Sequence, residues 1–177
     1  MKHTNYVIYT DYGENKLISQ QINEVLNEQI NKELYSGYLY LSMSAKFKEM
    51  GLIGFAHWLK EQAKEEVEHG LKIYDYLINR DSFVILKQIK TPDFDFNNIL
   101  QVFNEIYEHE RCITKAIMSI AKVAEEECDR TTLKFLDWFV EEQVQEEESV
   151  KYIIKRLEFF GETKCAMFLL DKELSER

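Results

Sequence analysis

Two potential metal ligands, Glu66 and His69, lie one helical turn apart in a strongly charged stretch of the chain. Such a stretch usually forms the solvated face of a helix. A hydrophobic period near 3.5 residues instead places both side chains on the apolar face of this segment. That face comprises Phe55, Leu59, Gln62, Glu66, His69, Ile73, Tyr76 and Arg80. A carboxylate and an imidazole in a protein interior are costly unless something pairs with them, so this pair is a candidate binding site.

Three further segments carry polar residues in the middle of an apolar helical face. Their faces are Ile22, Leu26, Gln29, Glu33, Gly37, Tyr40, Ser44 and Phe47; Ile99, Phe103, Ile106, Glu110, Ile113, Ile117, Ile120 and Ala124; and Leu136, Phe139, Gln143, Glu146, Val150, Ile153, Leu157 and Phe160. Glu33 precedes Glu66 by 33 residues, and Glu110 precedes Gln143 by the same number. The spacing predicts a duplicated helical hairpin whose polar residues meet at one height.

The predicted donor set suits a pair of metal ions. Four carboxylates and one imidazole would converge, and so many like charges cannot stay ionised in a dry interior without cations. Carboxylate and imidazole without thiolate favour ferrous or manganous ions and, less specifically, zinc. Glu66 could bridge two such cations. The five donors are Glu33, Glu66, His69, Glu110 and Glu146.

The two halves of this predicted site are unequal. Di-iron carboxylate bundles take a Glu from each of two helices and a Glu-x-x-His pair from each of the other two. Here one half is complete, Glu33 with Glu66-x-x-His69, whereas the other retains Glu110 but has Gln143-x-x-Glu146. We therefore expect one tightly held metal position and one weaker, exchangeable position.

Composition restricts the class of protein. The 177 residues suffice for one domain, and one proline with six glycines suits an almost wholly helical chain. A net charge of −10 argues against a nucleic-acid surface and favours the attraction of small cations. The cysteines Cys112, Cys128 and Cys165 are widely separated, as is typical of reduced thiols. Without an apolar run of roughly 18 residues or a signal-peptide core, we expect no membrane span and a cytoplasmic location.

The elements expected to position the site are four long helices and a short fifth one. We expect them at about residues 16–48, 55–80, 97–127, 129–160 and 163–174, with Gly51 and Gly161 ending the first and the fourth. Asp95 and Asp129 are the expected N-caps of the third and fourth. The segment between Arg80 and Asp95 is long enough to cross the bundle, which makes the fold class all-α, a ferritin-like four-helix bundle.

The chain divides into an N-terminal extension, residues 1–16, and a ferritin-like domain, residues 17–177. The extension contains Tyr6-Val7-Ile8-Tyr9 and a turn-like Asp11-Tyr12-Gly13, which favour an extended tail on the surface. Our hypothesis is that a neighbouring subunit holds this tail.

Five motifs give the sequence a family resemblance over about residues 17–176. They are Asn27-Glu28-Gln29-Ile30-Asn31-Lys32-Glu33-Leu34-Tyr35-Ser36, Glu65-Glu66-Val67-Glu68-His69, His109-Glu110, Trp138-Phe139-Val140-Glu141-Glu142-Gln143 and Leu169-Leu170-Asp171-Lys172-Glu173-Leu174-Ser175. Together they resemble the bacterial non-haem ferritins. The resemblance implies a hollow homo-oligomeric shell of 24 subunits. Such a shell oxidises Fe(II) to Fe(III) with dioxygen or hydrogen peroxide at a di-iron centre and stores the ferric mineral inside.

The resemblance also implies roles for individual residues. Glu33, Glu66 and His69 would hold the first iron. The second iron would take Glu66, Glu110 and Glu146, with Gln143 as a hydrogen-bonding residue or weak ligand. Tyr40 and Trp138 match aromatic residues beside the centre, either as ordinary core packing or as electron donors.

A third iron position and several alternatives stay open. The ligands of the third position would fall on Glu65, Glu142, Gln145 and Glu146, and Gln145 stands where the family pattern has a glutamate, so this position is weakened or reshaped. His109 lies off the apolar face and is expected to point outward or to support the ligands. A bacterioferritin would keep a second Glu-x-x-His, a rubrerythrin would add Cys-x-x-Cys, and a mini-ferritin would lack a fifth helix. A non-catalytic iron or zinc buffer and a purely structural assembly are the alternative functions.

Overall fold

The computed structural model describes residues 17–93, 98–161 and 163–176, and all regular structure in these ranges is α-helical. The five helices are α1 (Gln20–Glu49), α2 (Ile53–Asn79), α3 (Ile99–Glu126), α4 (Arg130–Phe160) and α5 (Lys164–Leu174). Each begins and ends within about one turn of the position expected from the sequence. The prediction of an all-α fold with four long helices and a short fifth one is confirmed. The proposed extension, residues 1–16, lies outside the described residues.

Local sequence explains where most helices begin and end. Asp129 caps α4 by accepting hydrogen bonds from the backbone N–H groups of Thr131 and Thr132, as expected. Gly51 follows the C-cap of α1 with a φ of +81°, a conformation that favours glycine. The cap of α3 is Asn98, which accepts from Gln101 N–H. The assignment of this cap to Asp95 was therefore wrong, and Asp95 itself lies outside the described residues.

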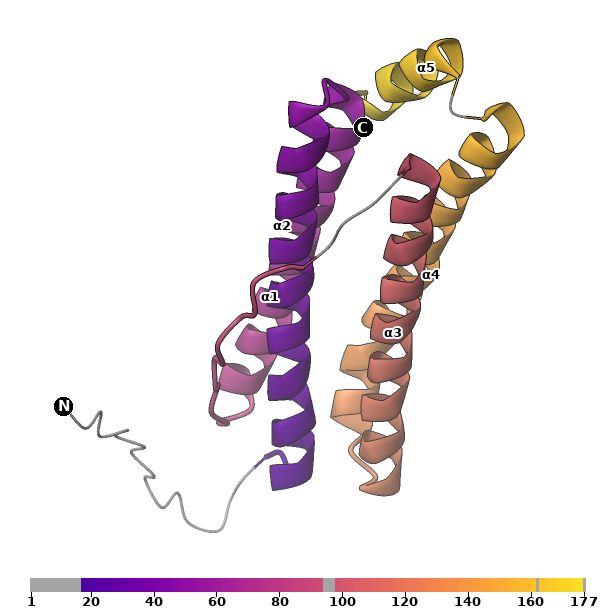
Figure 1. The fold of residues 1–177 in the computed structure, drawn as a ribbon. Helices are drawn as coiled ribbons and strands as arrows, with labels where there is room; N and C mark the ends of the chain where they lie inside the picture. The colour runs from indigo at the N-terminus through magenta and orange to yellow at the C-terminus, as the bar shows by residue number, and fades with distance from the viewer. Residues whose placement is uncertain (1–16, 94–97, 162, 177) are drawn as a thin grey trace, which may run out of the picture.

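The helices form two antiparallel hairpins, α1 with α2 and α3 with α4 (Figure 1). Residues 80–93, which follow α2, run back along the first hairpin, and α2 and α3 are parallel (Figure 1). In the described residues, no helix is both long and apolar enough to cross a membrane.

A ladder of asparagines on α1 holds this long connection. Asn27 donates to the carbonyl of Phe83 at 3.0 Å and accepts from the N–H of Ile85 at 2.5 Å. Asn31 repeats the pattern with the Ile85 carbonyl and the Lys87 N–H. Four residues of helix advance about 6 Å, which matches two residues of extended chain. Side chains spaced four apart can thus pair with every second residue of the connection.

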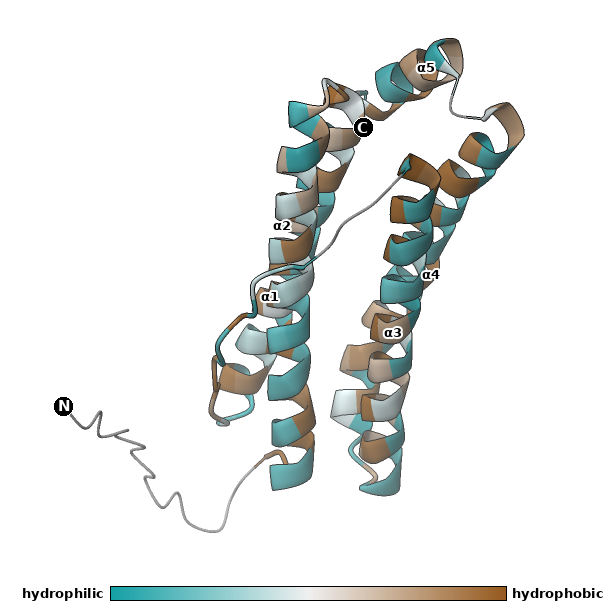
Figure 2. Cartoon of the chain, in the orientation of Figure 1, coloured by the Kyte–Doolittle hydropathy of each residue, from teal (hydrophilic) through white to brown (hydrophobic). Residues whose placement is uncertain are grey.

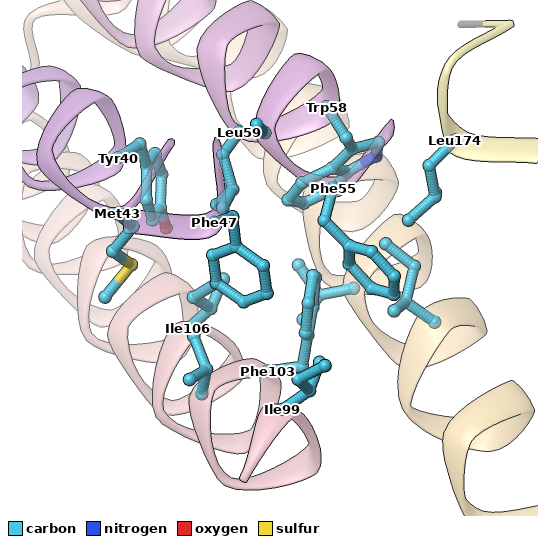
Figure 3. Packing of buried hydrophobic residues seen from close by; sticks show 14 of the residues in the cluster. Tyr40, Met43, Phe47, Phe55, Trp58, Leu59, Ile99, Phe103, Ile106 and Leu174 are labelled. Carbon is cyan, nitrogen blue, oxygen red and sulfur yellow. The ribbon is translucent and has the colours of Figure 1, made fainter. Parts of the chain in front are cut away.

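Two apolar cores fill the bundle. Both arise because apolar residues recur at helical spacing along the four long helices, which Figure 2 shows as alternating brown and teal segments. The aromatic core lies near α5 and contains Tyr40, Met43, Phe47, Phe55, Trp58, Leu59, Ile99, Phe103, Ile106 and Leu174 (Figure 3). The aliphatic core lies at the other end and contains Ile22, Leu26, Ile30, Ile73, Leu77, Ile113, Ile117, Ile120, Leu136 and Phe139.

The short helix α5 docks on the start of α2. Asp171 Oδ1 accepts hydrogen bonds from the N–H groups of Gly54 and Phe55, at 2.8 and 3.0 Å. The N-cap residue of α2, Leu52, offers no side-chain bond, so α5 supplies the missing cap. A Cβ at Gly54 would lie 1.6 Å from the Asp171 carbonyl oxygen, so this contact requires glycine. Phe160, expected on the apolar face of α4, is instead half exposed at the end of that helix.

Candidate metal centre

A layer of buried polar residues separates the two apolar cores. All four long helices contribute to this layer, which lies between the two cores. Its principal members are Glu33, Glu66, His69, Glu110, Gln143 and Glu146, each at most 5% exposed. The expectation that these side chains turn inward at one height therefore agrees with the structure.

Glu33, Glu66 and His69 form a ligand group in this layer whose three members are all buried. One ligand atom from each lies within 4.8 Å of the other two. His69 Nδ1 is 3.8 Å from Glu66 Oε2, and Gln29 Nε2 donates to Glu33 Oε1 at 2.8 Å. Close packing of α1 on α2 makes this approach possible, since a Cβ at Gly37 would lie 2.9 Å from the Ala63 carbonyl oxygen.

Two carboxylate oxygens in this group have no hydrogen-bond donor. They are Oε2 of Glu33 and Oε2 of Glu66, and both are fully buried. Buried polar atoms are nearly always paired, and an uncompensated buried carboxylate is costly. Either a proton shared between the two carboxyl groups or a cation must compensate them. The donor set and its spacing fit a divalent cation.

Burial and mutual repulsion favour protonation of these acids when no metal is bound. Burial, followed by the negative charge of Glu66, raises the pKa of Glu33 well above its usual value. Burial and the charges of Glu110 and Glu146 raise the pKa of Glu66 in the same way. Burial raises the pKa of Glu110 and that of Glu146 to about 7. A cation at this level would displace protons that the metal-free site holds.

Glu110 and Glu146, two of the three residues assigned to the second metal position, are engaged by neutral donors. The Tyr40 hydroxyl donates to Glu110 Oε1, and Gln143 Nε2 lies 3.3 Å from Glu110 Oε2. Gln62 Nε2 donates to Glu146 Oε2 at 2.5 Å. Among the described residues, Glu110 belongs to no group of three acidic or histidine ligands within 4.8 Å of one another. The structure thus assembles the first position more completely than the second.

A second ligand group adjoins the first. His69, Glu142 and Glu146 offer one atom each within 4.8 Å of one another. Of the set expected for a third position, Glu142 and Glu146 come together here. Gln145 is exposed, and Glu65 is partly buried but belongs to neither group found among the described residues.

Aromatic and histidine side chains surround the ligands. The His109 ring packs edge-on against Tyr40 at 5.9 Å between centroids, and its Nε2 lies 2.8 Å from Ser36 Oγ. His109 is thus a supporting neighbour, one of its two expected positions. The Trp138 ring lies 5.4 Å from that of His69, with Lys72 Nζ 3.9 Å above it.

Sequence reasoning gave no role to Gln29 and Gln62, although both contact the acids. Each precedes a candidate ligand on its own helix by four residues, Gln29 before Glu33 and Gln62 before Glu66. The two glutamines are also 33 residues apart, the interval that separates the two glutamates. This repeat was the signal that could have identified them as partners of the acids.

Comparisons with known proteins agree with the fold. The family model for the ferritin-like domain matches residues 23–160. A bacterial non-heme ferritin of Staphylococcus epidermidis is 37% identical over 161 residues, which are 91% of this chain and 97% of that protein. One from Campylobacter jejuni is 38% identical over 156 residues, or 88% and 93% of the two chains.

Solved structures give the same result. An open pore ferritin from the hyperthermophilic archaeon Archaeoglobus fulgidus superposes with a TM-score of 0.89. Its sequence is 42% identical, and the match covers 92% of this chain and 99% of that one. The sequence, the helical bundle and the buried acidic layer therefore lead to one conclusion: this chain belongs to the ferritin family.

Proposed function

We propose that this protein is a ferroxidase that oxidises ferrous iron in its buried acidic layer and stores the ferric product. Membership of the ferritin family supports iron binding, oxidation and storage in general. The observation that supports this specific site is the group Glu33, Glu66 and His69, with two buried carboxylate oxygens that lack a donor. The ferrous ions are substrate, and the layer brings two of them together.

In the proposed reaction, each of two ferrous ions loses one electron. Dioxygen takes up both electrons and two protons and becomes hydrogen peroxide; with hydrogen peroxide as oxidant, the products are two water molecules. Glu33, Glu66 and His69 hold one ion, and Glu66 also faces the second ion, with Glu110 and Glu146. Carboxylates favour the higher charge of ferric iron, which lowers the cost of removing each electron.

The unequal halves of the layer suggest unequal affinities. Glu110 and Glu146 must give up the hydrogen bonds from Tyr40 and Gln62, or share them, before they can hold an ion. We propose that the ion on this side is the weaker one and leaves after oxidation. Gln143 acts as a donor to Glu110 or as a weak ligand.

We further propose that residues 17–177 assemble as a shell of 24 subunits, as the family resemblance implies. Solvent-exposed apolar side chains at the end of α4 and on α5 support association of some kind. These are Phe159, Phe160, Phe168 and Leu169, all at least half exposed in the single chain. A monomeric soluble protein rarely exposes so many large apolar groups together.

The proposal is tested by the variant Glu66→Gln with Glu68→Gln as its matched control. Glu68 lies on the same helix but is exposed. We expect Glu66→Gln to lose rapid oxygen uptake after ferrous iron is added, while Glu68→Gln and the wild type keep it. Light scattering checks that all three proteins assemble alike.

The same experiment separates the alternatives. Anaerobic titration with ferrous iron should give about two ions per chain, the number that a bridged pair requires. Binding without oxygen uptake would indicate an iron buffer, and absence of binding would indicate a purely structural layer. Wild-type rates in Glu66→Gln would refute the assignment of the site.

A further inference from the structure

A cavity of about 200 Å³ lies between α3 and α4, beside the acidic layer. Four of the side chains that line it are aliphatic or thioether groups: Ile117, Met118, Val140 and Val144. Ile117 is buried, whereas Met118, Val140 and Val144 are exposed, so the cavity reaches from the surface into the bundle. No step of the proposed reaction has so far used it.

The side chain of Gln143, which is 4% exposed, also lines the cavity. Gln143 Nε2 lies 3.3 Å from Glu110 Oε2, from the Glu110 carbonyl oxygen and from Thr114 Oγ1. All three contacts lie at the long end of the range for N–H···O hydrogen bonds. Gln143 therefore contacts both the cavity and Glu110, a candidate iron ligand that does not line the cavity.

The charged residues on the cavity wall are already paired with one another. Glu147 accepts hydrogen bonds from Thr114 at 2.9 Å and from Lys151 at 3.2 Å, and Tyr107 adds a third at 3.3 Å. The wall therefore offers no uncompensated carboxylate to a cation, and Lys151 would repel one. A hydrated ferrous ion would also have to shed water against four apolar side chains.

We propose that this cavity admits dioxygen to the iron centre, with the side chain of Gln143 as the movable barrier. The proposal rests on the proposed function and names the route of its oxidant. Dioxygen is small, neutral and apolar, so its transfer from water into an apolar cavity costs little. It arrives beside Glu110, on the side assigned to the weaker iron. Ferrous ions reach the layer by a different path.

Xenon is a direct probe of the cavity because it is apolar and occupies apolar cavities in proteins. Crystals of the assembled protein under xenon pressure should show xenon between Ile117 and Val140, next to Gln143. Crystals soaked anaerobically in ferrous iron should show no metal ion there. Absence of xenon, or a metal ion in the cavity, would overturn the proposal.

Kinetics test the route with a blocking variant and a matched control. Val140→Phe would fill the opening, whereas Val123→Phe puts the same change on a partly buried valine of α3 that does not line the cavity. We expect Val140→Phe to raise severalfold the oxygen concentration that gives half-maximal oxidation, with unchanged anaerobic binding of ferrous iron. Val123→Phe should match the wild type in both measurements.

The outcomes distinguish this proposal from the function on which it rests. If the wild type takes up no oxygen with ferrous iron, the proposed function fails. If the wild type is active but Val140→Phe has an unchanged oxygen dependence, the route is wrong even where xenon binds. Loss of ferrous-ion binding in Val140→Phe would identify the cavity as a metal path and likewise overturn the proposal.

Discussion

Metal binding to the acidic layer should release protons, and the raised pKa values of the buried acids determine how many. Burial raises the pKa of Glu110 and of Glu146 to about 7 in the metal-free protein. At about pH 6, each of these carboxyl groups is roughly nine-tenths protonated. Metal ions bind the ionised form, so filling both positions at this pH should release about two protons from this pair. Glu33 and Glu66, whose pKa values are also raised, add to that number.

The same shifts set the pH dependence of affinity. When the pKa of a ligand group lies one unit above the pH, removing its proton costs about 1.4 kcal/mol of the metal-binding free energy. This cost lowers the affinity for the metal about tenfold. For Glu110 and Glu146 together, the apparent affinity should fall about 100-fold between about pH 8 and pH 6. Affinity thus rises with pH over this range, and Glu33 and Glu66, whose pKa values are raised well above the usual value, add to the rise.

The perturbation that tests this reasoning is Glu110→Gln. The amide cannot ionise, so the variant should release about one proton fewer at pH 6 than the wild type. Glu148→Gln, an exposed change on α4, is the control and should behave as the wild type. Anaerobic calorimetry with ferrous or cobaltous ions, in two buffers of different ionisation enthalpy, counts the protons. Equal proton release by Glu110→Gln and the wild type, or none at pH 6, would refute the assignment of the buried acids as ligands.

Three further predictions concern stability. Because the folded-state pKa of Glu110 and of Glu146 exceeds the reference value of 4.5, their contribution to stability is fully present below about pH 4.5 and is lost as the pH rises through about 7. The difference in melting temperature between Glu110→Gln and the wild type, both metal-free, should therefore shift in favour of the variant from pH 5 to pH 8, and a constant difference would contradict this. Asn27→Ala leaves the Ile85 N–H without its side-chain acceptor, while the Phe83 carbonyl keeps the hydrogen bond from Asn23. The change should cost about 1–3 kcal/mol and speed amide exchange at Ile85, and unchanged exchange would count against the asparagine ladder. Asp171→Ala removes the cap of α2 and should lower unfolding free energy by about 1 kcal/mol, whereas Asp171→Asn keeps an acceptor and should lose less, as denaturant titration of both variants would show.

Helical periodicity sufficed to predict the bundle and the inward orientation of its acids. Glu33, Glu66 and Glu110 stand among apolar residues at regular spacing, so the same hydrophobic effect that buries their neighbours determines where they point. Ligand type and the 33-residue repeat then restricted the chemistry. The roles of individual ligands stay predictions. The structure brings the first group together more completely than the second.

Helical periodicity could not predict features that depend on contacts between segments far apart in the sequence. The asparagine ladder requires α1 and the connection after α2 to lie side by side, and spacing within α1 does not show its partner. The cap that Asp171 supplies to α2 joins residues 117 apart in sequence. The α3 cap was misplaced at Asp95 because aspartate and asparagine both cap helices well, and only the backbone conformation distinguishes Asn98.

The division of the interior into two apolar cores has a mechanical consequence. The acidic layer interrupts the apolar packing between the four long helices, and two of its carboxylate oxygens have no donor. We therefore expect the middle of the bundle to be less stable than its two ends when no metal is bound. Bound cations would link the two hairpins at the level of the acidic layer. The chain would then be most rigid with metal ions bound and least rigid just after they leave. Amide exchange in the mid-helix segments would register this difference.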